Sequence, residues 1–331
     1  MMKIKKIENT IDSFHEINEF IQVWNDNNSS ITQQTSGSTG TPKAIEIPKW
    51  KMKASAQMTG KFLGLDHCKN ALICMSTKYI GGKMMLVRSI LYDLTIYVTN
   101  VTRNPLKNID FPIDFVAMVP LQVETILTEN PEKLNLIKYL IIGGAPVSDH
   151  LIEKLKDYSC HAYSTFGMTE TVSHIALRSL KTKNEPYFAL GNTHFSTQDN
   201  CLVIDCEELG INNLKTTDAI ELIDNKHFRW LGRTDFVINS GGVKIHPEQV
   251  EKKIAKAIQN ERFIISKLPD QHLGEKVIFI GEKDLDSSTL RAIVEANVDR
   301  YERPKEYYFI SSLQKTASGK IDRNKTTQVV S

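Results

Sequence analysis

The chain has 331 residues, of which 41% are hydrophobic and 24% charged, and 41 basic against 39 acidic residues leave a formal net charge of +2. This balance argues against a nucleic-acid binder whose affinity rests on neutralising phosphates. No apolar run approaches the ~20 residues needed to cross a bilayer, and the amino-terminal segment lacks the apolar region of a signal peptide. We therefore expect a soluble, cytoplasmic protein with a large and a small domain, whose five scattered cysteines are buried, reduced thiols.

The first predicted element is a short amphipathic helix over residues 13–24, because apolar residues recur there at helical spacing. Ser13 and Glu16 have the spacing of a capping box at its start. Apolar strands then alternate with helices, which is typical of α/β units around a largely parallel sheet. The strands are predicted at 71–75, 95–99, 115–119 and 139–142, and helices between them at 83–92 and 121–129.

The pattern changes after Tyr187, where shorter runs predict a small β subdomain. A Gly-rich junction follows at 231–242, and beyond it a compact α+β pattern predicts a small carboxyl-terminal domain. The β-like runs lie at 201–205, 219–223 and 227–231; the later helices at 247–259 and 288–298; and the later strands at 262–266, 277–281 and 307–310.

The strongest local signal is the stretch Thr35-Ser36-Gly37-Ser38-Thr39-Gly40-Thr41-Pro42-Lys43. Its glycines permit a tight loop, and its hydroxyls, its backbone N–H groups and the charge of Lys43 suit a polyphosphate. The stretch is not a Walker motif, because Thr-Pro-Lys follows the second glycine. A flexible linker is the alternative, although such linkers rarely end in Pro-Lys before an apolar strand.

Three further stretches offer groups that suit a nucleotide. The turn 143–146 (Gly-Gly-Ala-Pro) follows a predicted strand, where small residues leave room for a flat ring; a plain strand-to-helix turn is the alternative. The stretch 164–171 combines an aromatic ring, which can stack on a base, with Thr169 and Glu170, which can bind a phosphate oxygen and Mg²⁺. The alternative is that Thr169 and Glu170 only begin a helix. Asp218 offers a carboxylate to hydroxyl donors, although Thr216-Thr217-Asp218 is also an ordinary turn.

Two stretches in the last third of the chain are longer. Residues 232–251 run from Gly232-Arg233 through Gly241-Gly242 to a predicted helix, and their composition allows a hinge. Residues 315–323 place Lys320 on a turn shaped by Gly319. A lone lysine near a carboxyl terminus is ordinarily a solvated charge.

In this order, the six stretches resemble the adenylate-forming superfamily, which contains acyl-CoA synthetases, peptide-synthetase adenylation domains and luciferases. The resemblance runs from about Thr32 onward and implies that superfamily's α/β fold. It also implies a hinge at Asp235 between a large domain (1–234) and a mobile α+β domain (235–331). Only 34 residues precede Thr35, so the resemblance implies a shortened member in which the first subdomain is nearly absent.

The resemblance also assigns roles in a two-step reaction, in which a carboxylate attacks ATP and coenzyme A then takes the acyl group. Lys320, Thr169 and Glu170 are the implied catalytic residues, with Glu170 holding Mg²⁺. Phe166 and Gln314 stand where the superfamily commonly has Tyr and Pro. The implied ATP-binding residues are Thr35, Ser36, Gly37, Ser38, Thr39, Gly40, Lys43, Gly143, Gly144, Ala145, Phe166, Asp218 and Arg233, and the implied CoA tunnel contains Gly241, Gly242 and Lys244.

Within the superfamily, the short form and the wording of residues 78–84 and 164–171 resemble the ligases that act on 2-succinylbenzoate in menaquinone synthesis. Because that acid is a dicarboxylate, a cation is expected beside the carboxylate that is not activated. Arg88 is the first candidate and Lys83 the second. The alternative for Arg88 is a solvated residue on the surface of a helix. The other expected acid-site residues are Tyr79, Gly82 and Ser173, with His174 either lining the pocket or structural.

Two alternatives remain open, namely a ligase for another acid and a nucleotide-binding module that has lost catalysis. The presence of both Glu170 and Lys320 speaks against the second. A homodimer is one way to cover the apolar surface that a shortened front end leaves bare.

Overall fold

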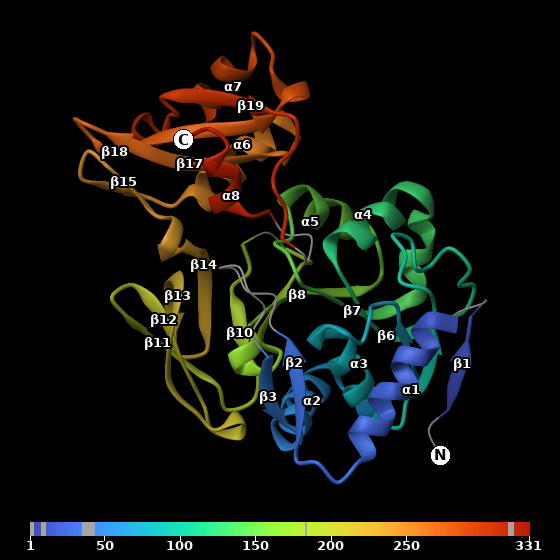
Figure 1. Cartoon of the computed structure of the whole chain (residues 1–331). Helices are drawn as coiled ribbons and strands as arrows, with labels where there is room; N and C mark the ends of the chain where they lie inside the picture. Colours follow the sequence, from blue (N-terminus) through green and yellow to red (C-terminus); the bar gives the residue numbers. More distant parts are fainter. Residues whose placement is uncertain (1–2, 8–10, 35–43, 183, 317–320) are drawn as a thin grey trace.

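A computed structural model (Figure 1) describes residues 3–7, 11–34, 44–182, 184–316 and 321–331. Twelve of the strands between Ile4 and Arg233 form one sheet, and the first strand of a five-stranded sheet begins at Ile238. A separate hairpin of β2 (Ser30–Gln34) and β3 (Ala44–Pro48) flanks segment 35–43. The predicted division at 234/235 falls in the connection between the two large sheets, and the division into two domains stays a prediction.

The first half of the twelve-stranded sheet is parallel, in the order β1-β5-β4-β6-β7-β8. Along β6, Val116 belongs to one buried cluster while its neighbours Phe115 and Ala117 belong to another, because successive side chains point to opposite faces. Both faces are therefore covered, which explains the nearly continuous apolar runs. The strands are β1 (Ile4–Lys6), β4 (Asn70–Ile73), β5 (Thr95–Val98), β6 (Ile113–Met118), β7 (Ile137–Ile142) and β8 (His161–Gly167).

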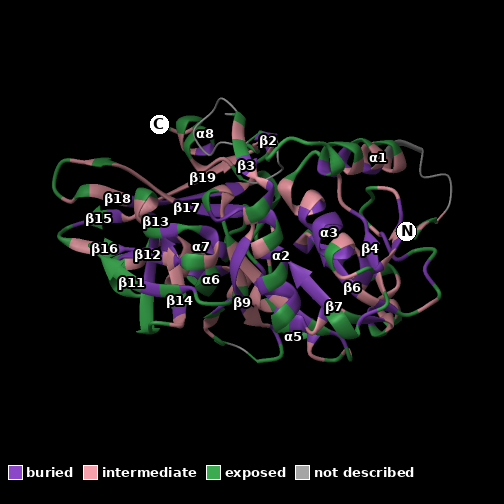
Figure 2. Cartoon of the chain, turned by 90° about the horizontal axis from the view of Figure 1, so that it is seen from below, coloured by how far each residue is buried: buried purple, intermediate pink, exposed green. Residues whose placement is uncertain are grey.

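Helices cover the two faces of this parallel half. They are α1 (Ile11–Asn25), α2 (Lys49–Leu63), α3 (Ile80–Leu91), α4 (Pro120–Glu129) and α5 (Asp149–Leu155). Buried residues of α1, α2 and α3 pack in one cluster with Phe115, and those of α4 and α5 pack in the other with Val116. Figure 2 shows buried residues along β7 and α3. The predicted α/β class is confirmed.

The second half of the same sheet is antiparallel, in the order β9-β10-β14-β13-β12-β11, so the predicted β subdomain continues the large sheet. Its strands are β9 (His174–Ser179), β10 (Tyr187–Ala189), β11 (His194–Gln198), β12 (Cys201–Cys206), β13 (Ile211–Asp224) and β14 (His227–Arg233). The ring centroids of Phe166 on β8 and Phe228 on β14 lie 5.0 Å apart, although three strand spacings in a flat sheet amount to ~14 Å. The sheet is therefore coiled, which brings β14 to β8.

The five-stranded sheet has its own core. Its strands are β15 (Ile238–Ser240), β16 (Val243–Ile245), β17 (Phe263–Asp270), β18 (Gly274–Glu282) and β19 (Glu306–Ile310), and its helices are α6 (Pro247–Ile258), α7 (Leu290–Asn297) and α8 (Arg323–Gln328). Ile254, Val294 and Phe279 are buried together between α6, α7 and the sheet. The predicted α+β pattern after residue 242 is therefore confirmed.

Several local predictions were wrong. The first helix begins at Ile11 rather than at Ser13, and Glu16 accepts a hydrogen bond from Ser76 Oγ (2.7 Å) and pairs with Lys78 Nζ (3.2 Å) instead of capping the helix. The stretch 216–218 is not a turn but lies within β13. The structure also has elements whose residues were not predicted to form any; they are α2, α5, α8, β1, β2, β8, β9, β10, β11 and the β15–β16 hairpin.

The structure bears on two further expectations, which concern the cysteines and membrane-spanning helices. All five cysteines are buried free thiols, as predicted. Among the described residues, none of the helices combines the length and the apolarity that crossing a membrane requires.

Candidate functional site

The ends of β7 and β8 bring two predicted stretches together. Ile142 on β7 is the register partner of Ser164 on β8, so the turn 143–145 lies beside the end of β8. A Cβ atom on Gly143 would lie 2.4 Å from Thr165 Oγ1, and Gly144 has φ +85°, which favours glycine. Strand β8 thus requires glycine at position 143, and the positive φ favours glycine at position 144.

The ring of Phe166 is held in place by other aromatic rings. It meets the buried ring of Phe228 edge-on, at 5.0 Å and 76°, and lies 5.7 Å from the ring of Tyr187. The hydroxyl of Tyr187 shares a hydrogen bond of 3.0 Å with Ser164 Oγ on β8. Phe166 itself is only half-buried. A ring fixed at its edge with some surface uncovered can stack on a flat ligand.

Asp218 and Arg233, predicted from separate stretches, are register partners on β13 and β14. Asp218 is only 7% exposed, and its Oδ1 accepts a hydrogen bond of 2.8 Å from Trp230 Nε1. Burial raises the pKa of Asp218, while the hydrogen bond from Trp230 and the charge of Arg233 act in the opposite direction. Sequence reasoning missed Trp230, although strand alternation places it on the same face as the buried Phe228.

The residues just before the predicted hinge are bonded to the start of helix α6. Arg233 Nη2 pairs with Asp235 Oδ2 at 2.6 Å, and the backbone N–H of Arg233 donates to Glu248 Oε1 on α6 at 3.2 Å. Gln249 Nε2 donates to the carbonyl of Leu231 at 2.6 Å. Gly232 has φ +152°, and a Cβ atom there would lie 2.5 Å from Glu248 Oε2. The start of α6 is therefore tied to the end of β14, beside a position that only glycine fills.

Thr169 and Glu170 lie in a single helical turn, η3 (Thr169–Thr171), that follows β8. The buried Thr171 fixes this turn, since its hydroxyl accepts from the N–H of Met168 at 3.0 Å. The side chain of Glu170 is exposed. No group of three or more His, Cys, Asp or Glu able to hold a metal occurs among the described residues. Mg²⁺ that binds with a nucleotide needs only one or two carboxylates besides phosphate oxygens, and Glu170 fits that requirement.

Arg88 is a fully buried charge next to Ser173. Its side chain is 1% exposed, and Nη2 donates to Ser173 Oγ at 3.1 Å. Its buried Nε has no hydrogen-bond partner in the part of the chain that the structure describes. Burial lowers the pKa of Arg88 to about 9. His174, which shares a hydrogen bond of 2.8 Å with Thr59 Oγ1, has a pKa held well below 6.5, first by burial and then by the charge of Arg88.

Lys83 is engaged by the strand that precedes segment 35–43. Its Nζ donates to Gln33 Oε1 at 2.7 Å, and the amide of Gln33, which is 3% exposed, also donates to the carbonyl of Lys78 at 3.2 Å. Gly82 packs so closely that a Cβ atom would lie 2.3 Å from the carbonyl oxygen of Ser76. Tyr79 is 55% exposed. Both cations expected at the acid site thus donate to neutral oxygens, but only Arg88 is fully buried and keeps a buried N–H without a partner among the described residues.

The residues predicted for the CoA tunnel are not brought to this edge. Gly241 (φ +56°) and Gly242 (φ +82°) form the turn of the β15–β16 hairpin, and Lys244 is exposed on β16. In both views this hairpin lies at the end of the molecule away from β7 (Figures 1 and 2). Thr35, Ser36, Gly37, Ser38, Thr39, Gly40, Lys43 and Lys320 lie outside the described residues.

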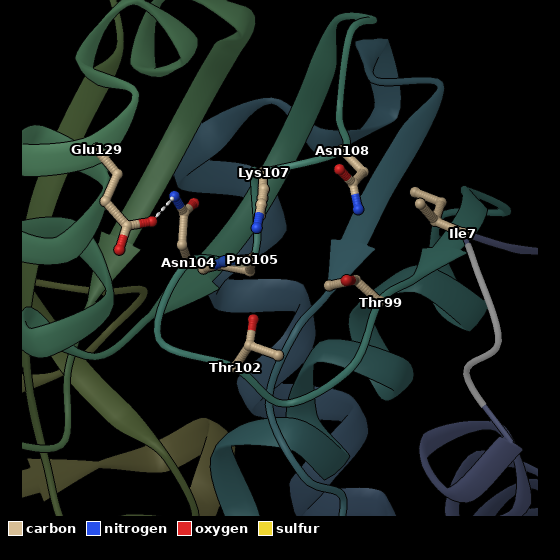
Figure 3. A pocket seen from close by; sticks show the side chains of 8 residues that line it. All are labelled: Ile7, Thr99, Thr102, Asn104, Pro105, Lys107, Asn108 and Glu129. Carbon is tan, nitrogen blue, oxygen red and sulfur yellow. Dashed lines mark hydrogen bonds between the residues drawn. The ribbon is translucent and has the colours of Figure 1, made fainter.

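A hollow of about 300 Å³ lies elsewhere, at the carboxyl end of β5 (Figure 3). Asn104 donates to Glu129 Oε2 at 2.7 Å across one side of it. None of its lining residues was predicted to bind a ligand; they are Ile7, Thr99, Thr102, Asn104, Pro105, Lys107, Asn108 and Glu129.

Known proteins resemble the chain over most of its length. Residues 8–209 match the family of AMP-binding enzymes. The 2-succinylbenzoate–CoA ligase of Listeria monocytogenes is 25% identical over 93% of this chain and 71% of that enzyme. A crystal structure of an acyl-CoA synthetase (AMP-forming)/AMP-acid ligase II-like protein from Dyadobacter fermentans shares 35% identity and a TM-score of 0.64, and the match covers 99% of this chain and 96% of that one.

The fold is also that of larger enzymes. O-succinylbenzoate coenzyme A synthetase from Bacillus subtilis, solved in complex with ATP and magnesium ion, has a TM-score of 0.75 at 21% identity. The match covers 89% of this chain and 69% of that one. The fold predicted from the six stretches is thereby confirmed.

Proposed function

The chain belongs to the family of AMP-binding enzymes, and from this premise we propose that it activates a carboxylic acid with ATP and transfers the acyl group to coenzyme A. The observation that carries the proposal is the placement of the turn 143–145 beside the fixed ring of Phe166. Small residues and an aromatic ring at the carboxyl edge of a parallel sheet suit an adenine base. The name of the Dyadobacter relative, 35% identical, agrees with this reaction.

In the first half-reaction, a carboxylate oxygen of the acid attacks the α-phosphorus of ATP, and pyrophosphate leaves. Phe166 stacks on the adenine, and Asp218 accepts hydrogen bonds from the ribose hydroxyls beside Arg233. The segment 35–43 binds the phosphates through its hydroxyls, its N–H groups and Lys43. Lys320 offsets the negative charge that gathers around the phosphorus, with Thr169 hydrogen-bonding a phosphate oxygen.

Glu170 is the residue proposed to hold Mg²⁺, which when bound offsets the charge of the phosphates. Its exposed carboxylate lies in the turn Thr169–Thr171, which the Thr171 hydroxyl fixes. The position is thus rigid at the backbone and open at the side chain.

In the second half-reaction, the thiol of coenzyme A attacks the carbonyl of the acyl-adenylate, and AMP leaves. The hairpin that contains Gly241, Gly242 and Lys244 is remote from β7 in this structure. Its proposed place along the thiol's path therefore depends on rotation of the small sheet and its helices about Asp235.

For the acid, we propose a dicarboxylate, most specifically 2-succinylbenzoate. The support is Arg88, a buried cation that meets only a serine hydroxyl and no carboxylate among the described residues. A buried charge is stabilised when a paired anion replaces the lost water. The second carboxylate of the acid supplies that anion, in agreement with the names of curated relatives about 25% identical. The cytoplasmic location and the homodimer stay predictions.

The reaction is tested by exchange of labelled pyrophosphate into ATP with 2-succinylbenzoate, benzoate and a fatty acid offered separately. We expect exchange with 2-succinylbenzoate alone. Exchange only with another acid supports the proposed ligase activity but rejects the proposal that the acid is a dicarboxylate. If the protein binds ATP but shows no exchange with any acid, it is a nucleotide-binding module without catalysis, and the proposal is wrong.

A further inference from the structure

A partly buried ion pair stands directly after the segment that contains Lys320. Arg323, the first residue of α8, pairs through Nη2 with Glu251 Oε2 on α6. The two side chains are 16% and 18% exposed, so the pair is shielded from water on most sides. An ion pair so shielded is rigid when its remaining hydrogen bonds are satisfied.

Those remaining bonds go to one backbone position. Arg323 Nη1 donates to the carbonyl of Ile265 at 3.1 Å, and Glu251 Oε1 accepts from the N–H of Ile265 at 2.6 Å. Ile265 lies on β17, which is an edge strand of the five-stranded sheet. The pair therefore satisfies the backbone N–H and C=O of Ile265, which a neighbouring strand would otherwise satisfy. It also fixes α8 against the sheet.

The other end of the Lys320 segment is tied to the same helix. Lys315 and Ile321 form an isolated antiparallel bridge, and the N–H of Asp322 donates to the carbonyl of Gln314 at 2.8 Å. The N–H of Gln314 in turn donates to Oγ1 of the fully buried Thr326 on α8, at 3.1 Å. Both ends of segment 317–320 thus depend on where α8 is held.

Arg323 also reaches the hinge. Its guanidinium carbon lies 5.3 Å from the centre of the Phe236 ring, a distance at which a cation is attracted to an aromatic face. Phe236 adjoins Asp235, whose carboxylate pairs with Arg233 at 2.6 Å. One side chain therefore contacts the hinge segment and at the same time fixes the helix that follows Lys320.

We propose that Arg323 is a positioning residue for adenylation, which holds the described residues on either side of the Lys320 segment against the small sheet and the hinge. The proposal rests on the function proposed above. A lysine that offsets charge at phosphorus must be placed closely, since a misplacement of about 1 Å can cost on the order of 10²-fold in rate. The thiol half-reaction does not use Lys320, so it does not need this placement.

The test compares the variants Arg323→Lys and Phe236→Leu with Asn324→Ala, a control that truncates an exposed side chain on the same helix. Arg323→Lys keeps a positive charge but loses the forked geometry that joins Glu251 and Ile265. We expect kcat of pyrophosphate exchange to fall about 10²-fold. KM for ATP and thioester formation from supplied acyl-adenylate should stay within about twofold. Phe236→Leu should lower the same kcat by a smaller factor, and the control should match the unchanged protein.

Hydrogen exchange of the Gln314 and Asp322 amides provides a readout that does not depend on catalysis. We expect faster exchange in Arg323→Lys and no change in the control. Equal loss of both half-reactions, or an unchanged adenylation rate, overturns the proposal. If the unchanged protein activates no acid, the proposed function is wrong. The amide exchange then still decides whether Arg323 holds this segment, and an unchanged rate rejects it.

Discussion

Asp218 and Arg233 stand directly opposite each other on β13 and β14, because these two consecutive strands form an antiparallel hairpin. The indole of Trp230, on the same strand as Arg233, donates to the Asp218 carboxylate at 2.8 Å. One carboxylate is thus oriented by a ring on one side and faces a guanidinium-bearing residue across the ladder. Two predictions made from distant stretches therefore meet at one place on the coiled part of the sheet.

Trp230→Phe should weaken ATP binding, because the ring is kept while the donor that orients Asp218 is lost. A single hydrogen bond of this kind contributes about 1 kcal/mol, so we expect KM for ATP to rise about fivefold with little change in kcat. Pyrophosphate exchange at varied ATP concentration measures both. The matched control is Trp50→Phe, at an exposed position on α2. An unchanged KM in Trp230→Phe means that Asp218 needs no such orientation.

Arg88→Met should have opposite effects on stability and on acid binding. The free energy of unfolding should rise by about 1–3 kcal/mol, since an apolar side chain of similar length replaces a buried charge without an anionic partner. KM for 2-succinylbenzoate should rise about 10–100-fold, which is the worth of a charged hydrogen bond. Urea unfolding and pyrophosphate exchange measure the two effects.

The control for Arg88 is Arg103→Met, which removes an exposed guanidinium in the loop after β5. It should alter neither quantity by more than the error of the measurement. A lower stability of Arg88→Met with an unchanged KM identifies Arg88 as a structural residue.

The alternation of strands and helices was predictable because the strands of a doubly covered parallel sheet are continuous apolar runs, as in Ile113–Met118. Helix α2 escaped because its buried face consists largely of small or polar residues such as Ser55, Thr59 and Gly60. Gly60 is needed there, since a Cβ atom would lie 2.1 Å from the Tyr92 ring. Close packing against α3 therefore replaces the apolar periodicity that marks a helix in sequence.

Only those parts of the site that short sequence motifs mark could be predicted. The turn 143–145 follows the predicted strand 139–142, whereas strand β8, which contains Phe166, was not predicted. The partners of the other side chains depend on pairing and packing: Trp230 reaches Asp218 through the register of the β13–β14 hairpin, and Gln33 reaches Lys83 from a segment fifty residues away. Strand register and helix packing fix such contacts, and no local pattern contains them.

Lys83→Met should damage the phosphate side of the site rather than the choice of acid. Removal of the ammonium leaves the buried Gln33 Oε1 without its donor, which costs about 1–3 kcal/mol. Because Gln33 lies two residues before Thr35, we expect lower stability and a higher KM for ATP. The preference for 2-succinylbenzoate over benzoate should not change.

Lys78→Met serves as the control for Lys83, since the Lys78 side chain is exposed while its carbonyl still accepts from Gln33. Loss of discrimination between the two acids in Lys83→Met, with ATP binding intact, transfers the acid-binding role from Arg88 to Lys83.

The stability of the protein should decline in mild acid because of His174. Its pKa is held well below 6.5 in the folded chain, so on acidification the unfolded chain takes up a proton that the folded chain does not. The free energy of unfolding therefore falls as the pH drops below about 6.5, by about 1.4 kcal/mol per pH unit from this group. His174→Gln, which retains a partner for Thr59, should flatten this slope in urea unfolding between pH 6.5 and 5. An equal slope in both proteins assigns the acid sensitivity to other groups.

Lys320→Ala should separate the two half-reactions more completely than any other change. The ammonium is proposed to stabilise charge at phosphorus, an effect whose loss costs about 10²–10³-fold or more in rate when one such group is removed. Pyrophosphate exchange should therefore fall to background, while thioester formation from supplied acyl-adenylate continues within about twofold. Thr326→Val, which removes the hydroxyl that accepts from the N–H of Gln314, is the comparison that keeps the ammonium and disturbs only its support. It should lower exchange by a smaller factor. If Lys320→Ala lowers both half-reactions alike, the lysine acts on the fold or on a shared step, and the charge-offsetting role is wrong.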